Sequence, residues 1–156
     1  MSEILDRVAV LLARGFGVGC SPVAPGTLGT VLAVPLLCLQ LIWSTGQFLV
    51  FVLLFVLAAV YVATVAEKWM DETDDPSIVI DEMAGFLIAM TCVPLTVWSI
   101  LAGFLLFRVF DIFKPFPVKT VERKVPGGLG IVSDDLVAGL MTNALLQLTI
   151  RLNIFS

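Results

Sequence analysis

The stretch that decides the fold is Phe48–Ala66, FLVFVLLFVLAAVYVATVA, which contains no charged residue. It approaches the ~20 apolar residues that a helix needs to cross a bilayer. Because backbone polar groups find no water in hydrocarbon, such a run is expected to be helical. The whole segment between Arg14 and Glu67 is free of charge, and Ser44–Gln47 separates this run from a shorter one, Leu28–Trp43. The two runs predict a helical hairpin that turns at Ser44–Gln47.

Composition points to the same environment. Hydrophobic residues make up 59% of the 156 residues and charged residues only 14%, and the mean hydropathy is +1.05. Soluble domains are roughly 45–50% apolar and about 25% charged, so a soluble monomer could not cover its surface with so few charges. The formal net charge of −4 argues against nucleic acid as a partner, because nucleic-acid binding usually leaves a basic footprint. We therefore expect a single membrane-embedded domain over residues 1–156, built as an all-α, multi-pass helical bundle.

Two more apolar runs follow, Met83–Phe107 and Leu136–Ile150. Pro94 interrupts the longer run, and a proline inside a helix removes a hydrogen bond and kinks or breaks the helix. This pattern predicts a second helical hairpin that turns near Pro94. The run as a whole is long enough to span once, whereas its two halves are short for full crossings, so a re-entrant hairpin is the second possibility.

Basic residues precede the first hairpin and follow the second. The positive-inside tendency places both groups in the cytoplasm, which requires an even number of crossings between them. The segments around 15–27, 67–82 and 108–135 are then expected at one membrane face. The basic residues are Arg7, Arg14, Arg108, Lys114, Lys119, Arg123 and Lys124. The last three are interpreted as a patch against anionic lipid headgroups.

Five carboxylates stand at the boundaries of the apolar runs. Asp81 and Glu82 open the third run, Asp111 closes it, and Asp134 and Asp135 open the last run. Ionisable groups beside an apolar zone are costly and usually mark function. Five acids at one face would repel one another unless a cation lay among them, and carboxylate oxygens suit Mg²⁺. The pattern predicts a Mg²⁺ site, with the two adjacent pairs, Asp81–Glu82 and Asp134–Asp135, as the expected ligands.

The same residues also have purely structural interpretations. Acids are favoured in the first turn of a helix, and Ser133 or Asp134 would make a good N-cap. Asp111 could pair with Arg108 or Lys114 across one helical turn. The charged residues of 67–75 are interpreted as a solvated loop or a fraying helix end.

Two glycine-rich stretches are candidates for phosphate contacts, because glycine lets the backbone approach an anion and helix N-termini point amides at it. One runs from Ser21 to Thr30 and the other is Gly127–Gly130. For either stretch alone a simple turn is the favoured explanation, and neither has the lysine-bearing pattern of a P-loop. The residues expected at a phosphate are Ser21, Gly26, Thr27, Gly128 and Gly130.

Absent residue types narrow the chemistry. The chain contains no histidine, which excludes a phosphohistidine intermediate. None of its cysteines, Cys20, Cys38 and Cys92, is followed six residues later by arginine, and there is no Asp-x-Asp pair. What remains is metal-assisted attack by water or attack by a lone aspartate. The cysteines fit neither a disulfide framework nor a zinc spacing and are expected to be small buried side chains.

Four blocks of the sequence, spread over most of the chain, resemble the phosphatidylglycerophosphatase A family. Thr30 stands where that family would have serine, a hydroxyl-for-hydroxyl change. The resemblance implies an all-α fold, Mg²⁺ dependence and conversion of phosphatidylglycerophosphate to phosphatidylglycerol and inorganic phosphate. It also implies the bacterial inner (cytoplasmic) membrane, with the active site facing the cytoplasm. The blocks are Ser21-Pro22 through Pro25-Gly26-Thr27 and Gly29; Asp81-Glu82; Phe107-Arg108, Asp111, Lys114-Pro115 and Pro117; and Gly127-Gly128, Gly130-Ile131 and Asp134-Asp135.

Residues and resemblance together predict a mechanism. The four acids of the two pairs hold one or two Mg²⁺ ions, Asp111 acts as general base or as a further ligand, and Lys114 and Arg108 neutralise the phosphoryl oxygens. The main alternative is a membrane cation transporter with a carboxylate ion site. Transport sites tend to lie near the bilayer midplane within broken helices, whereas these acids lie at run boundaries. A non-catalytic scaffold of a membrane complex is a third possibility.

Overall fold

The computed structural model describes residues 3–71, 75–125 and 127–152, without the side chains of 122–124. Every regular element within these residues is a helix, which confirms the all-α prediction. The order is α1 (Glu3–Ala13), the 3₁₀ segment η1 (Gly15–Cys20), α2 (Pro25–Leu37), the 3₁₀ segment η2 (Cys38–Leu41), α3 (Thr45–Met70), α4 (Ile80–Ala89), α5 (Val97–Phe113), α6 (Val118–Lys124) and α7 (Gly127–Arg151).

The predicted run Phe48–Ala66 forms the middle of α3. The turn before it ends earlier than predicted, because Ser44 is the N-cap and Gly46 and Gln47 already belong to the helix. The Ser44 hydroxyl accepts a hydrogen bond from the Gln47 amide, and the Gln47 side chain accepts one from the Ser44 amide at 2.9 Å. This reciprocal capping box is a strong helix start. The hairpin turn is therefore confirmed, with its boundary moved to Ser44.

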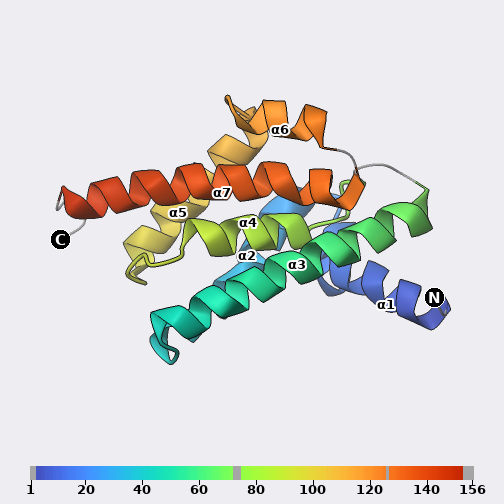
Figure 1. Cartoon of the computed structure of the whole chain (residues 1–156), viewed down its shortest axis with the longest axis horizontal. Helices are drawn as coiled ribbons and strands as arrows, with labels where there is room; N and C mark the ends of the chain where they lie inside the picture. The colour runs from blue at the N-terminus through green and yellow to red at the C-terminus, as the bar shows by residue number, and fades with distance from the viewer. Residues whose placement is uncertain (1–2, 72–74, 126, 153–156) are drawn as a thin grey trace.

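Helix α4 is the centre of the bundle. It contacts α2, α3, α5 and α7, and Figure 1 shows it lying between α3 and α7 with α2 behind. Phe86 and Leu87 of α4 are fully buried, as are Phe107 of α5 and Leu146 of α7. The arms of the first hairpin, α2 and α3, thus both pack on α4, which comes later in the chain.

Glycines let α4 and α7 approach at backbone distance. A Cβ built on Gly139 would collide with the carbonyl oxygen of Gly85. A Cβ on Gly85 would lie 2.6 Å from the carbonyl oxygen of Asp135. Such small residues allow helices to pack closely, as they do between membrane helices. This contact places Asp135 of α7 beside the first half of α4.

The prediction that Pro94 breaks the third run is confirmed. Helix α4 ends at Ala89, α5 begins at Val97, and Pro94 lies in the connection between them. The connection is held by side-chain amides from other elements. The Asn143 amide of α7 donates hydrogen bonds to the carbonyl oxygens of Ile88 (3.3 Å), Ala89 (3.0 Å) and Thr91 (2.7 Å).

Two glutamines complete the same set of contacts. Gln147 donates to the Cys92 carbonyl at 3.0 Å, and Gln40 donates to the Met90 carbonyl at 3.1 Å. The last carbonyls of a helix have no intrahelical partner, so side chains must satisfy them where water cannot. The α4–α5 connection therefore has internal partners for the backbone groups that the break exposes.

Much of the outer surface is apolar. Helices α3 and α7 are long and apolar enough to cross a membrane, by length and composition. Only 28% of the most apolar window of α3 is buried inside the protein, so large side chains such as Leu53 and Leu57 face outward. Trp98 and Leu105 of α5 are exposed in the same way. Apolar surface on this scale marks a membrane or a protein partner.

Two predictions need correction or restriction here. The three cysteines are exposed, so the prediction that they are buried is wrong. Sulfhydryls tolerate the same apolar surroundings on the outside of this chain as in a core. Of the predicted basic patch, Lys119 is exposed on α6, whereas the side chains of Arg123 and Lys124 lie outside the described residues.

Candidate active site

Asp81 and Glu82 lie in the first turn of α4. The positive end of a helix dipole favours acids at such a position. They do not act as side-chain caps, however, because the N-cap is Val79 and no side chain caps this helix end. Asp81 accepts a hydrogen bond from the Glu82 amide at 3.0 Å. Asp81 is buried, at 7% exposure, which is more than a capping role would require.

Asp134 and Asp135 lie well inside α7, which begins at Gly127. The interpretation of Ser133 or Asp134 as an N-cap is therefore wrong. The sequence was misleading because the helix continues through the glycine-rich stretch rather than starting after it. The two acids are consequently held by regular helix on both sides and are 7% and 3% exposed.

Carboxylates from α4 and α7 meet at one place. Ligand oxygens of Asp81, Glu82 and Asp135 all lie within 4.8 Å of one another. Asp111 and Asp134 are close enough to repel the Asp135 charge, so the five predicted acids converge. Two carboxylate oxygens, Oε2 of Glu82 and Oδ1 of Asp135, are buried without a hydrogen-bond partner. We call these five side chains the acid cluster.

Two cations contact the edge of the acid cluster. Arg108 Nη1 lies 2.6 Å from Asp111 Oδ2 and 3.6 Å from Glu82 Oε1. The predicted pairing of Asp111 with Arg108 on one helix is thus present. Lys114 Nζ instead reaches across to Asp134 Oδ2 at 2.7 Å. Five carboxylates against two cations leave a surplus of three negative charges when all are ionised.

Burial makes this surplus costly. Burial raises the pKa of Asp81 well above its usual range, and the neighbouring Glu82 charge raises it further. Burial likewise raises the pKa of Glu82 to about 7, with a smaller contribution from the Asp111 charge. A cation between the carboxylates would reverse both effects by favouring the ionised forms.

The donor set fits a hard divalent cation. Every candidate ligand atom in the acid cluster is a carboxylate oxygen, which suits Mg²⁺ and not soft metals. The two partnerless oxygens of Glu82 and Asp135 are the kind of buried acceptor that requires a ligand. Asp134 is the predicted ligand that stands apart, because it pairs with Lys114 and is not among the three mutually close carboxylates.

Gly26 is the predicted phosphate-contact residue that the structure brings to the acid cluster. A Cβ there would collide with Glu82 Oε1 and would lie 3.2 Å from Arg108 Nη1. The fully buried Thr30 hydroxyl donates to the Gly26 carbonyl at 2.9 Å, a contact that a serine hydroxyl could also make. A side chain at position 26 would therefore displace the Glu82 carboxylate from its present place.

The other predicted phosphate-contact residues have different surroundings. Ser21 makes a local turn with Val23, whose carbonyl accepts from the Ser21 hydroxyl at 3.1 Å. Thr27 is partly buried in the first turn of α2. Gly128 packs on the backbone of Thr64 in α3. Gly130 packs on the Val125 carbonyl. Gly128 therefore lies against α3, and Gly130 lies against the connection before α7.

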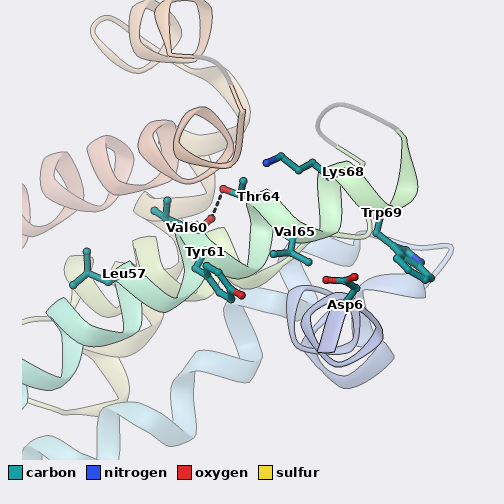
Figure 2. A pocket seen from close by; sticks show the side chains of 8 residues that line it. All are labelled: Asp6, Leu57, Val60, Tyr61, Thr64, Val65, Lys68 and Trp69. Carbon is teal, nitrogen blue, oxygen red and sulfur yellow. Dashed lines mark hydrogen bonds between the residues drawn. The ribbon is translucent and has the colours of Figure 1, made fainter. Parts of the chain in front are cut away.

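A groove of about 680 Å³ lies elsewhere, along the outer side of α3. Figure 2 shows its lining on α3, from Leu57 to Trp69, with Asp6 contributed by α1. None of the five acids lines this groove. The chemistry-bearing residues and this groove are therefore separate features of the molecule.

Sequence reasoning missed two sets of polar residues. Asn143 and Gln147 stand four apart in an apolar run, so one helix face carries both amides, and that spacing was the available signal. Arg14 was counted only as a topology signal, yet its guanidinium contacts Ser77 and Met70. No local pattern connects residues this far apart in the sequence.

Known proteins resemble this chain over most of its length. The family model described as Phosphatidylglycerophosphatase A matches residues 11–150. The chain is 39% identical over 137 residues to phosphatidylglycerophosphatase A of Escherichia coli strain K12, covering 87% of this chain and 80% of that protein. It is 42% identical over 135 residues to phosphatidylglycerophosphatase A of Haemophilus influenzae, covering 83% and 81%.

A third relative carries a different description. The chain is 41% identical over 143 residues to a putative phosphatidylinositol-3-phosphatase of Bacteroides thetaiotaomicron, covering 84% of this chain and 86% of that protein. No solved structure shows a significant match. All three relatives are described as lipid phosphatases, and the chain is accordingly a phosphatase. Because the family model and these relatives cover most of its length, the chain belongs to the phosphatidylglycerophosphatase A family.

Proposed function

We propose that this chain hydrolyses phosphatidylglycerophosphate to phosphatidylglycerol and inorganic phosphate, and that the reaction depends on Mg²⁺. The observation that carries the proposal is the meeting of Asp81, Glu82 and Asp135 within 4.8 Å. Asp81 and Asp135 are buried, and one oxygen each of Glu82 and Asp135 has no hydrogen-bond partner. Family membership supports the lipid phosphomonoester as substrate. Water attacks the phosphorus atom, and its oxygen becomes part of the inorganic phosphate. The bond from phosphorus to the glycerol oxygen breaks, and that oxygen takes up a proton.

Asp81, Glu82 and Asp135 would hold the metal directly. A bound Mg²⁺ would polarise the phosphoryl group and neutralise part of its charge. Asp134 is proposed as a ligand through water, or as the partner that aims Lys114, since its Oδ2 lies 2.7 Å from Lys114 Nζ. The number of acids exceeds what Mg²⁺ usually takes from a protein, which is one or two carboxylates plus substrate phosphate.

Positive side chains would bind the phosphoryl oxygens. Arg108 presents a planar fork and Lys114 a point charge, and both already lie beside the acid cluster. Asp111 is the proposed general base or further ligand, and its contact with Arg108 also orients the guanidinium. Backbone at Gly26 is close enough to Arg108 and Glu82 to contact the same phosphate.

The proposed setting is the bacterial inner (cytoplasmic) membrane, with residues 1–156 as one multi-pass unit and the site facing the cytoplasm. The α2–α3 hairpin and α7 would cross the bilayer, and the α4–α5 hairpin would enter and return. Irregular backbone at membrane depth is tolerated only where protein satisfies it. The amide contacts of Gln40, Asn143 and Gln147 to that connection support this placement.

A phosphate-release assay on purified protein tests the proposal. Lipid phosphates are compared in mixed micelles: phosphatidylglycerophosphate, phosphatidylinositol 3-phosphate and phosphatidic acid, each with Mg²⁺ or EDTA. We expect release from phosphatidylglycerophosphate with Mg²⁺, and none with EDTA or from Asp135→Asn. Preferred release from phosphatidylinositol 3-phosphate would favour the activity in the name of the Bacteroides relative.

The cation-transporter alternative predicts a different result. It would give Mg²⁺ flux into liposomes with no phosphate released from any lipid. The scaffold alternative would leave the five acids replaceable at little cost. Either outcome would overturn the phosphatase proposal for this site.

A further inference from the structure

Arg14, the residue after α1, makes a set of contacts that the proposed chemistry does not use. Its Nε donates to Ser77 Oγ at 2.8 Å, and its Nη2 contacts Met70 Sδ at 2.9 Å. The same Nη2 lies 3.7 Å from Asp75 Oδ2. Arg14 thereby joins the end of α1, the last residue of α3 and the segment that leads into α4.

That segment, Asp75–Val79, is held along its length. Asp75 Oδ1 accepts a hydrogen bond from the Ser77 amide at 2.7 Å. The Val79 amide donates to the carbonyl oxygen of Ala13, the residue before Arg14, at 2.9 Å. Val79 is fully buried and is the N-cap of α4, two residues before Asp81.

The charges in this contact are matched. Burial by itself would raise the pKa of Asp75, but hydrogen bonds from Ser77 and the Arg14 charge leave it below its ordinary value. Asp75 is therefore ionised at neutral pH, and its side chain is only 14% exposed. Arg7, which lies within α1, differs from Arg14, since it pairs with Glu3 at the surface and its side chain is 68% exposed. Surface pairs of that kind contribute little.

We propose that Arg14 is a positioning residue for the metal site: its guanidinium fastens the segment Asp75–Val79 to α1 and so sets where Asp81 and Glu82 face Asp135. The inference rests on the proposed function, because it concerns the metal site on which that function depends. Arg14 touches none of the five acids in the contacts above. It acts through the backbone that precedes α4. Residues that contact metal ligands directly typically change metal affinity by about 10- to 100-fold, and the low end of that range is expected for Arg14.

The test uses Arg14→Met, Arg14→Lys and Ser77→Ala, with Arg7→Met as the matched control. Direct Mn²⁺ binding is measured by electron paramagnetic resonance, and phosphate release is measured against Mg²⁺ and against lipid. We expect Arg14→Met to weaken Mn²⁺ binding and raise the half-saturating Mg²⁺ concentration by roughly tenfold. KM for the lipid should stay unchanged. Ser77→Ala should shift metal binding in the same direction by less, Arg14→Lys should restore part of it, and Arg7→Met should match the unsubstituted protein.

Several outcomes would overturn the inference. One is Mn²⁺ binding by Arg14→Met equal to that of the unsubstituted protein, even if its thermal stability falls. If Arg14→Met fails to fold, unchanged Mn²⁺ binding by Ser77→Ala is decisive against it. A failure of the proposed function looks different: the unsubstituted protein would bind Mn²⁺ but release no phosphate, and the effect of Arg14 on Mn²⁺ binding would still be measurable.

Discussion

The two ends of α4 differ in whether their polar groups have hydrogen-bond partners. At its C-terminal end, side-chain amides of Asn143, Gln147 and Gln40 donate hydrogen bonds to carbonyls of the helix end and of the connection that follows it. At its N-terminal end, Glu82 Oε2 and, across from it on α7, Asp135 Oδ1 are buried with no partner. Leaving a buried polar group unsatisfied costs about 1–3 kcal/mol, and more for a charge.

The contrast shows where the fold is complete by itself. The C-terminal end of α4 needs nothing further, so its polar residues are structural. The cation and the anionic substrate that we propose would satisfy the N-terminal end. A helix whose polar groups have partners at one end and lack them at the other is best explained by function at the end that lacks them.

The largest expected effect is the loss of activity in Asp135→Asn. Removing one of the three mutually close carboxylates should lower phosphate release by about 100-fold or more. Because the change removes a buried charge among repelling neighbours, stability in EDTA should stay equal or rise. Phosphate release and thermal unfolding in detergent measure the two quantities. Asp81→Asn, Asp111→Asn and Asp134→Asn should also abolish turnover with the fold retained, and wild-type release from them would refute the assignment.

Asn143→Leu, at the C-terminal end of α4, is expected to lower stability and to leave phosphate release nearly unchanged. Carbonyls at the end of α4 would lose their donor, which should lower stability by about 3 kcal/mol. Phosphate release per folded molecule should change little, because Asn143 contacts none of the acids in the observed bonds. Denaturant unfolding and activity are compared on the same preparation. Full loss of activity without loss of stability would contradict the view that the C-terminal end of α4 is structural and the N-terminal end functional.

A smaller effect is expected where α4 and α7 touch. Gly139→Ala places a Cβ against the Gly85 carbonyl, so the helices must separate, at a cost of about 2 kcal/mol. Metal affinity should weaken as well, since α7 carries Asp135. Gly46→Ala is the control, because a Cβ there meets nothing within 4 Å. Equal unfolding midpoints for the two variants would contradict the close helix contact.

The smallest effect is expected at an exposed helix end. Ser44→Ala removes the capping box of α3 and should cost about 1 kcal/mol, with no change in phosphate release or metal binding. This variant measures how much a solvent-accessible cap contributes to stability. That value is then compared with the contribution of the partly buried contacts of Asn143. A loss as large as that of Asn143→Leu would show that burial is not the reason for the difference.

Local patterns in the sequence predict much of the fold. The uncharged run Phe48–Ala66 and the break at Pro94 each have a local cause, and both appear in the structure as predicted. The start of α7 was misplaced, because Gly127–Gly130 read as a turn, whereas tertiary contacts of Gly128 with Thr64 favour helix there. Contact with a distant element outweighs weak local propensity in such a case.

The candidate site was likewise only partly predictable from the sequence. The types of its residues and their positions at run boundaries were visible in the sequence, and they predicted a cation among the acids. Which acids meet was not visible: Asp134 joins Lys114 rather than the close group of three, and Gly26 rather than Gly128 faces the carboxylates.

The amino-acid sequence by itself determined that the chain is helical, strongly apolar and provided with acids and bases suited to phosphate chemistry, because composition and short-range pattern control those properties. The tertiary structure alone decided which oxygens share a site, which amides close the end of α4, and that Arg14 fastens the segment before it. Those features depend on side chains far apart in the sequence, and only the packing of α4 against α2, α3, α5 and α7 brings them within bonding distance.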